Sequence, residues 1–369
     1  MSPGRVVIVS STPSTLPSAP TWRDRVIRFA EAATTPLLPA DYLDLFTPLR
    51  SGADLRGRIV AIEPETRDSV TVTIRPGRDW RGHRPGQYIR IGVDVNGVRQ
   101  WRAYSLTSRT DRTDGCVTIT TKAIPDGKVS NHLVRHARVG QLIHLDQAAG
   151  DFVLPDPAPA KTLFVTAGSG VTPVMGMLRN GVAGDVTVLH CAPSAADSIF
   201  RDELQAMADA GRIRLVARYD DVHGILDTAD LPALVPDLAE RTTYACGPVG
   251  LLEALEKQWA DLGLPDQLHT ERFRPVVVSA GEGGTVTFAR GGSVVASGGS
   301  TPILDAAEEA GVLMPSGCRM GICFGCVLPM REGAVRDLRN GELTIATPGD
   351  GVVIQTCISA AAGDCTLEH

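Results

Sequence analysis

No stretch of the 369-residue chain is apolar for long enough to cross a membrane. The short apolar run at residues 6–9 is also too short for the core of a secretory signal peptide. Acidic residues outnumber basic ones by 42 to 36, and the net charge of −6 is not that of a typical nucleic-acid-binding protein, which carries a basic excess. We therefore expect a cytoplasmic chain with no transmembrane span and no nucleic-acid partner.

A single domain does not account for the chain. Its length, with 43% hydrophobic and 21% charged residues, is typical of two or three soluble globular domains. Short apolar segments of period two predict an antiparallel six-stranded β-barrel over residues 56–154. Alternating strands and helices predict a doubly wound parallel α/β sheet over residues 155–274. Small residues at 275–284 favour a linker, and residues 285–369 mix strands with a helix.

Within these domains the patterns also predict individual elements. Among them are a helix over residues 199–210, a helix opened by Thr301 and Pro302, and a last strand over residues 352–358.

Residues 1–55 form an N-terminal extension with two parts. Residues 1–20 are rich in Ser, Thr and Pro, and we expect them to be mobile because they cannot bury much apolar surface. Apolar residues at helical spacing after Thr21 predict an amphipathic helix that Pro36 ends. Two interpretations stay open: the extension packs against its own neighbouring domain, or it docks onto a partner or a membrane surface.

The most informative pattern lies in the last domain, where three cysteines follow the spacing C-x4-C-x2-C and a fourth comes later. This is the plant-type pattern of four thiolates that hold a 2Fe-2S cluster. A structural zinc site and unrelated cysteines are the alternatives. Disulfide bonds are set aside, because they would need an oxidising compartment. Arg319, between the first two cysteines, adds a positive charge beside an anionic cluster. The predicted metal ligands are Cys318, Cys323, Cys326 and Cys357.

Such a cluster carries one electron at a time, whereas a nicotinamide gives up two electrons as a hydride. A group that splits the electron pair should therefore be bound elsewhere in the chain. We accordingly expect a flavin site and a nicotinamide site upstream of the cysteines.

The predicted barrel contains the motif Arg102-Ala-Tyr-Ser105. The motif resembles the R-x-Y-S flavin motif of the ferredoxin–NADP reductase superfamily. Two companions support the resemblance: Arg84-Pro-Gly-Gln-Tyr88 upstream, and a G-K-x-S helix start at residues 127–130 whose backbone N-H groups can bind a pyrophosphate. The resemblance favours FAD over FMN because of this G-K-x-S-x-x-L loop.

The same resemblance implies roles for individual residues. Tyr104 would lie against the flavin ring, Ser105 would hydrogen-bond near its reactive nitrogen, and Arg102 would bind the flavin phosphate. The flavin-binding residues that it implies are Arg102, Ala103, Tyr104, Ser105, Leu106, Thr107, Gly127, Lys128, Val129 and Ser130.

A glycine-rich turn, Gly168-Ser-Gly170, comes after one predicted strand and before one predicted helix. In that context its backbone can reach a pyrophosphate, although a simple tight turn is the alternative. The superfamily resemblance extends to Thr172-Pro173 and to the segment Cys246-Gly-Pro248, which implies that Cys246 lies near the nicotinamide carbon that gives the hydride. A plain buried thiol is the other interpretation of Cys246.

The choice between NADH and NADPH stays open at this point. The turn at residues 190–198 contains no Lys or Arg, and Arg201 is the first cation available for a 2′-phosphate. Glu271 and Phe273 are similar to acidic and aromatic groups that flank the flavin edge in related reductases. The nicotinamide-side residues implied are Gly168, Ser169, Gly170, Thr172, Pro173, Arg201, Cys246, Gly247, Pro248 and Phe273.

The order flavin, nicotinamide, ferredoxin resembles that of reductases of oxygenases, hydroxylases and fatty-acyl desaturases. The resemblance implies an α+β β-grasp fold for the ferredoxin domain. It also implies that electrons pass from NADH or NADPH through FAD and the 2Fe-2S cluster to an oxygen-activating partner, in the first place a fatty-acyl desaturase. The catalytic residues that it implies are Tyr104, Ser105, Cys246 and Glu271.

Three alternatives for the function remain beside this prediction. The partner could instead be a Rieske oxygenase or a cytochrome P450. A redox sensor with an iron–sulfur cluster would be a protein of a different class. The N-terminal extension leaves open a peripheral location at the membrane, through docking to a membrane-bound partner.

Overall fold

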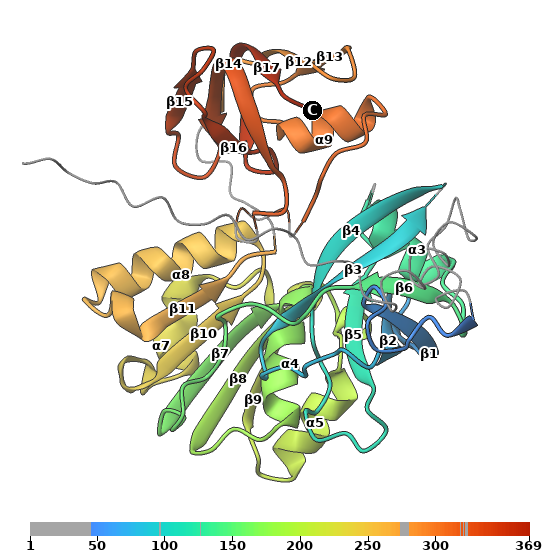
Figure 1. Cartoon of the computed structure of the whole chain (residues 1–369). Coiled ribbons are helices and arrows are strands. Elements are labelled where there is room, and N and C mark those ends of the chain that lie inside the picture. Colours follow the sequence, from blue (N-terminus) through green and yellow to red (C-terminus); the bar gives the residue numbers. More distant parts are fainter. Residues whose placement is uncertain are drawn as a thin grey trace, which may run out of the picture.

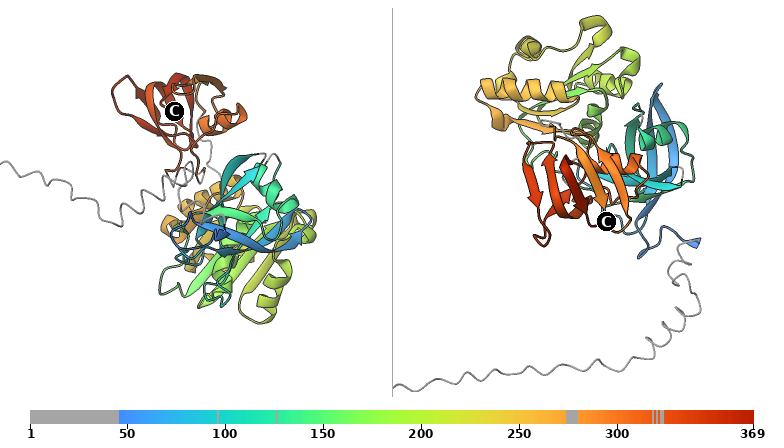
Figure 2. Two further views of the ribbon diagram at one scale, coloured as in Figure 1. Left: turned by 45° about the vertical axis from the view of Figure 1, so that its right-hand side comes forward. Right: turned by 90° about the horizontal axis from the view of Figure 1, so that it is seen from above.

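The computed structural model describes residues 46–95, 97–125, 127–273, 280–317, 319, 321 and 324–369. The helix predicted after Thr21 and two of the predicted metal ligands, Cys318 and Cys323, lie outside these residues. The described chain forms three domains, and Figure 1 shows the C-terminal domain above the other two. The left view in Figure 2 shows it as a lobe of its own.

The first domain is a six-stranded antiparallel sheet in the order β4-β3-β6-β1-β2-β5. Strands β2, β3 and β5 are buried over most of their length, and Ile74, Ile89 and Ile91 have no exposed surface. A bridge between Leu106, just after β4, and Ile119 of β5 joins the edge strands, so the predicted barrel is confirmed. Its elements are β1 (Arg56–Thr66), β2 (Ser69–Pro76), β3 (Tyr88–Val95), β4 (Val98–Ser105), β5 (Val117–Lys122), α3 (Lys128–Arg135) and β6 (Leu142–Leu145).

The second domain is a parallel sheet in the order β11-β10-β7-β8-β9, which confirms the predicted doubly wound fold. Helices α4 and α5 pack on one face, and α7 and α8 pack on the other. The strand order reverses between β7 and β10, which is where ligands bind in open α/β sheets. The principal elements are β7 (Lys161–Ala167), η1 (Gly168–Gly170), α4 (Val171–Arg179), β8 (Asp185–Ala192), α5 (Arg201–Asp209), β9 (Arg214–Tyr219), α6 (Asp220–His223), α7 (Leu231–Leu234), β10 (Thr242–Cys246), α8 (Val249–Asp261) and β11 (Leu268–Glu271).

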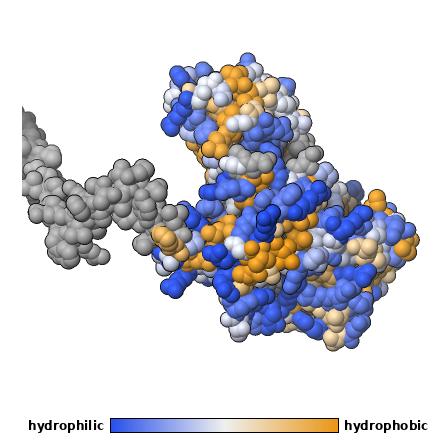
Figure 3. All heavy atoms as spheres, turned by 90° about the vertical axis from the view of Figure 1, so that its right-hand side faces the viewer, coloured by the Kyte–Doolittle hydropathy of each residue, from blue (hydrophilic) through white to orange (hydrophobic). Residues whose placement is uncertain are grey.

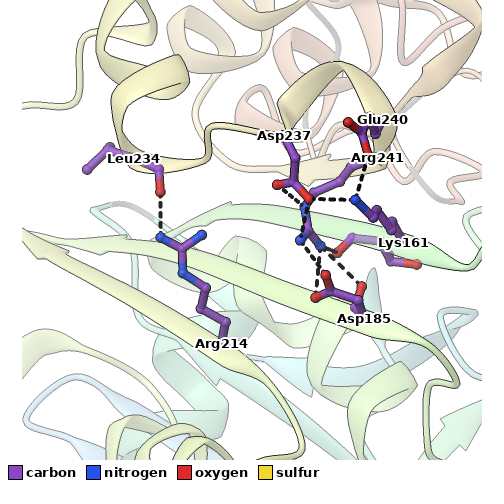
Figure 4. Close-up of polar contacts among 8 residues, drawn as sticks. Lys161, Asp185, Arg214, Leu234, Asp237, Glu240 and Arg241 are labelled. Carbon is purple, nitrogen blue, oxygen red and sulfur yellow. Dashed lines mark hydrogen bonds and ion pairs between the residues drawn. The ribbon is translucent and has the colours of Figure 1, made fainter.

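An ion-pair cluster joins the amino ends of this sheet (Figure 4). Arg241, only 3% exposed, donates to the carboxylates of Asp237 (2.8 and 2.9 Å) and Asp185 (2.7 and 3.2 Å). Lys161 Nζ adds bonds to Asp237 at 3.0 Å and to Glu240 at 2.5 Å. We call these five residues the Arg241 cluster. Its carboxylates neutralise the buried guanidinium, so its role is structural.

The third domain is a mixed sheet in the order β13-β12-β17-β14-β15, with β16 paired to β14. Only β12 and β17 run parallel among these pairs. Helix α9 buries Ile303 and Leu304 in the core that also contains Phe288, Leu328 and Leu367. Its elements are β12 (Gly284–Phe288), β13 (Ser293–Ser297), α9 (Ile303–Glu309), β14 (Val327–Asp337), β15 (Leu343–Ala346), β16 (Val353–Gln355) and β17 (Ser359–Leu367).

Two predicted helices begin later than expected. Helix α5 starts at Arg201 rather than 199, because Phe200 has the left-handed backbone angle φ 60° that a helix interior does not allow. Helix α9 starts at Ile303, with Pro302 as its N-cap, one residue later than predicted. The structure also places Gly284, at the end of the expected linker, in β12, and the N-H of Gly281 donates to Gly299 O at 2.6 Å.

The last predicted strand, over 352–358, is wrong at its end. Strand β16 stops at Gln355, and Thr356 turns the chain because both its N-H and its hydroxyl donate to the backbone oxygen of Cys326, at 3.3 and 3.0 Å. Cys357 therefore lies in a turn. The sequence patterns also missed β14 and β17, the two central strands of this sheet.

Hydrophilic residues cover much of the face in Figure 3, and apolar residues gather there in separate areas on the C-terminal domain and on the two domains below it. Among the described residues, every helix is too short or too polar to span a bilayer.

Candidate functional site

A cleft of about 530 Å³ lies where the three domains meet. Motifs that are far apart in the sequence therefore line one cavity. The barrel contributes β4 and the start of α3, the parallel-sheet domain contributes the turn before α4 and the end of β11, and the third domain contributes the start of α9. The predicted site residues that line it are Arg102, Ala103, Tyr104, Ser105, Gly127, Val129, Ser130, Ser169, Thr172, Glu271, Phe273 and Cys357.

Strand β4 brings the polar side chains of the R-x-Y-S motif to this cleft. Ser105 is 3% exposed, and its Oγ has no hydrogen-bond partner among the described residues. Burial raises the pKa of Tyr104 to about 12, so its hydroxyl stays protonated and able to donate. A buried hydroxyl without a partner is costly, and a ligand with polar atoms would satisfy Ser105.

Arg102 is a partly buried cation that forms no ion pair with any described carboxylate. Its Nη1 donates to the backbone oxygen of Trp101 at 2.7 Å. Burial, and then the positive charge of nearby Arg319, lower the pKa of Arg102 to about 10. A buried charge without a counterion is unfavourable, so the site fits an anion such as a flavin phosphate.

The turn before α3 is shaped for a close backbone approach. A Cβ on Gly127 would lie 2.4 Å from the hydroxyl oxygen of Ser130, and Asn131 Nδ2 braces the turn by donating to the oxygens of Gly127 and Ile124, both at 2.8 Å. Gly127 is the N-cap and offers no side chain, so the first N-H groups of α3 can bind an anion. A second hollow of about 560 Å³ lies beside this turn, and predicted Lys128 lines this hollow rather than the central cleft.

The glycine-rich turn of the second domain packs directly on the end of β10. A Cβ on Gly170 would lie 2.0 Å from the backbone oxygen of Cys246, so only glycine fits. This contact brings the two predicted nicotinamide segments together at the strand-order reversal. The hydroxyl of Thr172 donates to the backbone oxygen of Ser169 at 3.0 Å and fixes the first turn of α4.

Cys246 and Glu271 are neighbours across β10 and β11. Cys246 has no exposed surface, and burial, followed by the charge of Glu271, raises the pKa of its thiol. Burial also raises the pKa of Glu271 to about 8, and its Oε2 has no partner among the described residues. Near pH 7 this carboxyl group is therefore largely neutral and can donate a hydrogen bond into the cleft.

Two predicted metal ligands, Cys326 and Cys357, are 1% and 3% exposed. The bonds from Thr356 to the backbone oxygen of Cys326 bring these two cysteines together. Gln355 Nε2 donates to the oxygen of Gly321 at 3.0 Å, and Gly321 has a left-handed φ of 75°. This arrangement fits a buried cluster for the two ligands that lie in the described part of the chain.

Several predicted residues do not line the central cleft. Leu106 is buried in the barrel core, and the hydroxyl of Thr107 bonds to that of Thr118 at 2.8 Å. Arg201 lies at the start of α5, half exposed, with its Nε 3.0 Å from Asp202. The other described residues outside the lining are Lys128, Gly168, Gly170, Pro173, Cys246, Gly247, Pro248 and Cys326.

The sequence patterns missed some residues of the site. Thr120, Thr121 and Lys122 of β5 line the cleft, and the break in the alternation of apolar and polar residues at the end of this strand was the available signal. Arg218 lies half-buried near the end of β9, opposite Cys191 of β8, and donates to the oxygen of His223 at 3.2 Å. The signal for Arg218 was its position next to Tyr219, the last residue of a predicted strand, because ligands bind at the carboxyl ends of such strands.

Comparison with protein families matches all three domains. Residues 68–154 match the oxidoreductase FAD-binding domain, residues 164–257 the oxidoreductase NAD-binding domain, and residues 288–362 the 2Fe-2S iron-sulfur cluster binding domain. The chain is 49% identical to an NADPH oxidoreductase of Mycobacterium tuberculosis over 350 residues, which cover 92% of this chain and 91% of the relative.

Two further likenesses are more distant. The chain is 30% identical to the ferredoxin reductase component of 3-ketosteroid-9-alpha-monooxygenase from Mycobacterium tuberculosis, over 76% of this chain and 84% of that protein. The solved structure of phthalate dioxygenase reductase matches with a TM-score of 0.60 at 19% identity, over 85% of this chain and 97% of that one. At that identity the likeness shows the fold alone.

Fold, cleft and family matches together define an NAD(P)H-dependent flavin and iron–sulfur oxidoreductase. The chain belongs to the ferredoxin–NADP reductase superfamily, as a reductase with three modules in the order FAD, NAD(P) and 2Fe-2S ferredoxin. The predictions of FAD, a nicotinamide and a 2Fe-2S cluster are thereby confirmed.

Proposed function

We propose that this reductase delivers electrons from NADPH, through FAD and the 2Fe-2S cluster, to an oxygen-activating partner. One observation carries the proposal: Cys357 of the ferredoxin domain lines the same cleft as Ser105 of the flavin domain and Glu271 of the nicotinamide domain. All three modules thus contribute to one cavity, as a continuous path for electrons requires. FAD, when bound, supplies the conversion between a hydride and single electrons.

Each predicted residue has a proposed role in holding the cofactors. Arg102 and the N-terminus of α3 bind flavin phosphates, as the unneutralised guanidinium and the open helix end suggest. Ser105 and Tyr104 donate hydrogen bonds to the flavin, and neutral Glu271 donates one at the side where the nicotinamide enters. Cys246, which is fully buried with a raised pKa, acts by packing and not as a base.

We favour NADPH as the donor for two reasons. The relative at 49% identity is named an NADPH oxidoreductase. Two cations, Arg201 and Arg218, also lie near the carboxyl ends of β8 and β9, on the side of the sheet where a 2′-phosphate would arrive.

For the partner, we propose a fatty-acyl desaturase first and a Rieske oxygenase second. The resemblance in module order, together with the N-terminal extension, supports the desaturase. The 30% identical relative is named as a component of a monooxygenase, which supports an oxygenase as the second candidate. Coupled turnover with each purified partner, measured as product formed per NADPH oxidised, separates them. Oxidation of NADPH without product from either partner would contradict both.

The order of electron flow is tested by Cys326→Ser. A hydroxyl is a poorer iron ligand than a thiolate, so this variant should damage the cluster. We expect it to keep most NADPH–ferricyanide activity, because ferricyanide accepts electrons from the flavin, and to lose most cytochrome c reduction. Cys365→Ser is the matched control, since Cys365 is a buried thiol of the same domain outside the ligand pattern. Unchanged cytochrome c reduction by Cys326→Ser would show that the cluster is not the exit for electrons.

A further inference from the structure

Arg90, in the middle of β3, links the flavin domain to the ferredoxin domain. Its Nη2 donates to the backbone oxygen of Ser316 at 2.9 Å, across 226 positions of sequence. Ser316 comes just before the cysteine loop, which we define as residues 317–326. A side chain of the barrel therefore holds the chain at the entrance to the loop that carries three of the four predicted ligands.

Contacts inside the barrel fix the Arg90 side chain, which is 18% exposed. Its Nη1 lies 3.0 Å from a carboxylate oxygen of Asp146, and its guanidinium carbon lies 5.3 Å from the centre of the Trp101 ring. Trp101 is itself close to β3, since a Cβ on Gly92 would lie 2.9 Å from the indole. Because the barrel already orders the guanidinium, little conformational entropy is lost when it binds the ferredoxin domain.

The position of Arg90 on the sheet relates it to the flavin motif. Arg90 pairs with Ala103 across β3 and β4, and the next pair joins Ile91 to Arg102. Figure 1 shows β3 and β4 on the side of the barrel below the ferredoxin domain. The strand that contacts the entrance to the cysteine loop is therefore paired directly with the strand that carries the flavin motif.

A second contact region supports the same docked arrangement. Arg319, inside the cysteine loop, bonds to Asp305 and Glu308 of the ferredoxin domain, and its charge acts on Arg102 of the flavin domain. Arg319 and Arg102 repel, but Asp305 and Glu308 favour the charged form of Arg102, so the region brings the two domains close although no ion pair joins Arg102 to a described carboxylate. The bond from Arg90 is accordingly an attractive contact at this boundary that does not depend on a bound cofactor.

We propose that Arg90 is a positioning residue that holds Ser316, at the entrance to the cysteine loop, against the flavin domain and thereby sets the rate of electron transfer from flavin to cluster. The inference rests on the proposed function. Each transfer oxidises the flavin by one electron and reduces the cluster by one, so the pair from one hydride needs two transfers. Domains joined by small polar interfaces move relative to one another by default, which is why a single fixed bond matters here.

The test uses the holoenzyme with Arg90→Gln, Arg90→Lys and Asp146→Asn. Arg90→Gln removes the charged donor, whereas Asp146→Asn disturbs the pair within the barrel and leaves the donor to Ser316 in place. Rapid mixing with NADPH gives separate rates for flavin reduction and for cluster reduction. Hydrogen exchange over residues 310–317 and small-angle scattering report docking without reference to activity.

We expect Arg90→Gln to leave flavin reduction and ferricyanide activity unchanged and to slow cluster reduction about tenfold, the effect of losing one charge-assisted bond of about 1.5 kcal/mol. Exchange over residues 310–317 and the maximum dimension of the particle should both increase. Arg90→Lys should recover part of the rate. Asp146→Asn keeps the donor to Ser316 and an acceptor at position 146, so it should slow cluster reduction much less than Arg90→Gln does.

Parental rates of cluster reduction in Arg90→Gln, with unchanged exchange and scattering, would overturn the inference while leaving the proposed function intact. Equal slowing by Asp146→Asn would also overturn it, because the effect would then come from the barrel. If the parent protein itself reduced no cytochrome c, the proposed function would fail instead.

Discussion

The two ends of strand β10 hold buried ionisable groups that differ in their partners: one group is fully ion-paired and the other lacks a partner for one of its oxygens within the described residues. Just before the strand, Arg241 is buried and bonded to the carboxylates of Asp237 and Asp185 (Figure 4). At its other end, Cys246 lies beside Glu271, whose carboxyl group is buried with one oxygen unpaired among the described residues. Burial would lower the pKa of Arg241, but its bonds to both aspartates raise it, whereas burial alone raises the pKa of Glu271 to about 8.

The difference separates groups that stabilise the fold from groups that await a ligand. A fully bonded buried charge costs the protein only its desolvation, which the partners offset. A buried polar atom without a partner, or a buried charge without a counterion, is retained at a cost in stability. Among the described residues of the cleft, the first applies to Ser105 Oγ and Glu271 Oε2, and the second to Arg102. Loss of a group at the amino end should therefore affect folding, and loss of a group in the cleft should affect binding.

The largest effect should come from Arg241→Ala. Its removal leaves Asp185 and Asp237 without their buried counterion, and we expect the free energy of unfolding to fall by about 3 kcal/mol, because both carboxylates keep some contact with water. FAD content per folded molecule should stay at the parental level. Urea unfolding measures the change. Arg214→Ala is the control, since Arg214 is exposed at the same end of the sheet and its side chain donates a single hydrogen bond within the described residues, to the backbone oxygen of Leu234. A loss below about 0.5 kcal/mol, typical of surface sites, would mean that the cluster is not structural.

Glu271 gives the second prediction, a dependence of stability on pH. Between the ordinary pKa of 4.5 and the folded-state value of about 8, the folded protein holds a proton that the unfolded chain has lost. Stability should therefore fall as the pH rises through this window, by up to about 1.4 kcal/mol per unit, and this contribution should end above pH 8. Melting temperatures measured from pH 5 to 9 should fall with rising pH in the parent and in Glu253→Gln, the control at an exposed site. They should not show this fall in Glu271→Gln. The same slope in all three proteins would remove Glu271 from the explanation.

The fold was predictable from sequence where local patterns and tertiary pairing agree. The barrel and the parallel sheet follow from apolar periodicity, and both are confirmed. Strand β17 was missed because Ser359-Ala-Ala-Ala-Gly-Asp-Cys365 has little intrinsic preference for a strand and is held there by β12 and β14 on either side. Strand β14 contains Pro329 and Gly333, and its pairing with β17 shifts register near that glycine.

The site was predictable in its motifs but not in the way they meet. Sequence alone identified the segments around Tyr104, Gly168 and Cys326, because each is a local pattern with its own chemistry. It could not show that Arg90 meets Ser316, since nothing local relates residues 226 positions apart. Leu106 and Thr107 illustrate the opposite error, because a motif includes residues whose side chains serve the barrel core.

Arg102→Ala should bring the converse of the Arg241 result. Removing an unpaired, partly buried cation should leave the stability of the apoprotein unchanged or slightly higher. The affinity for FAD should fall tenfold or more, because a charge-assisted bond to phosphate is worth about 1.5 to 3 kcal/mol. Titration of apoprotein with FAD, followed by flavin fluorescence, measures this against the exposed control Arg78→Ala. Parental affinity in Arg102→Ala, or a clear loss of apoprotein stability, would place Arg102 with the structural group.

Arg201 is neither buried with its counterion, like Arg241, nor buried without one, like Arg102. Its substitution gives the smallest expected effect. It has a carboxylate partner, Asp202, but both side chains are exposed, so their ion pair contributes little and the guanidinium is free to turn toward a ligand. If it binds the 2′-phosphate, Arg201→Ala should raise the KM for NADPH about tenfold, the equivalent of about 1.4 kcal/mol, and leave that for NADH unchanged. Arg214→Ala, at the opposite end of β9, should change neither value. If the KM for NADPH rose selectively in Arg218→Ala but not in Arg201→Ala, the 2′-phosphate would be assigned to Arg218 of β9. If Arg201→Ala raised the KM for NADPH and the KM for NADH equally, Arg201 would instead shape the turn at residues 195–198, where its Nη1 donates to the oxygen of Ala195 at 3.4 Å.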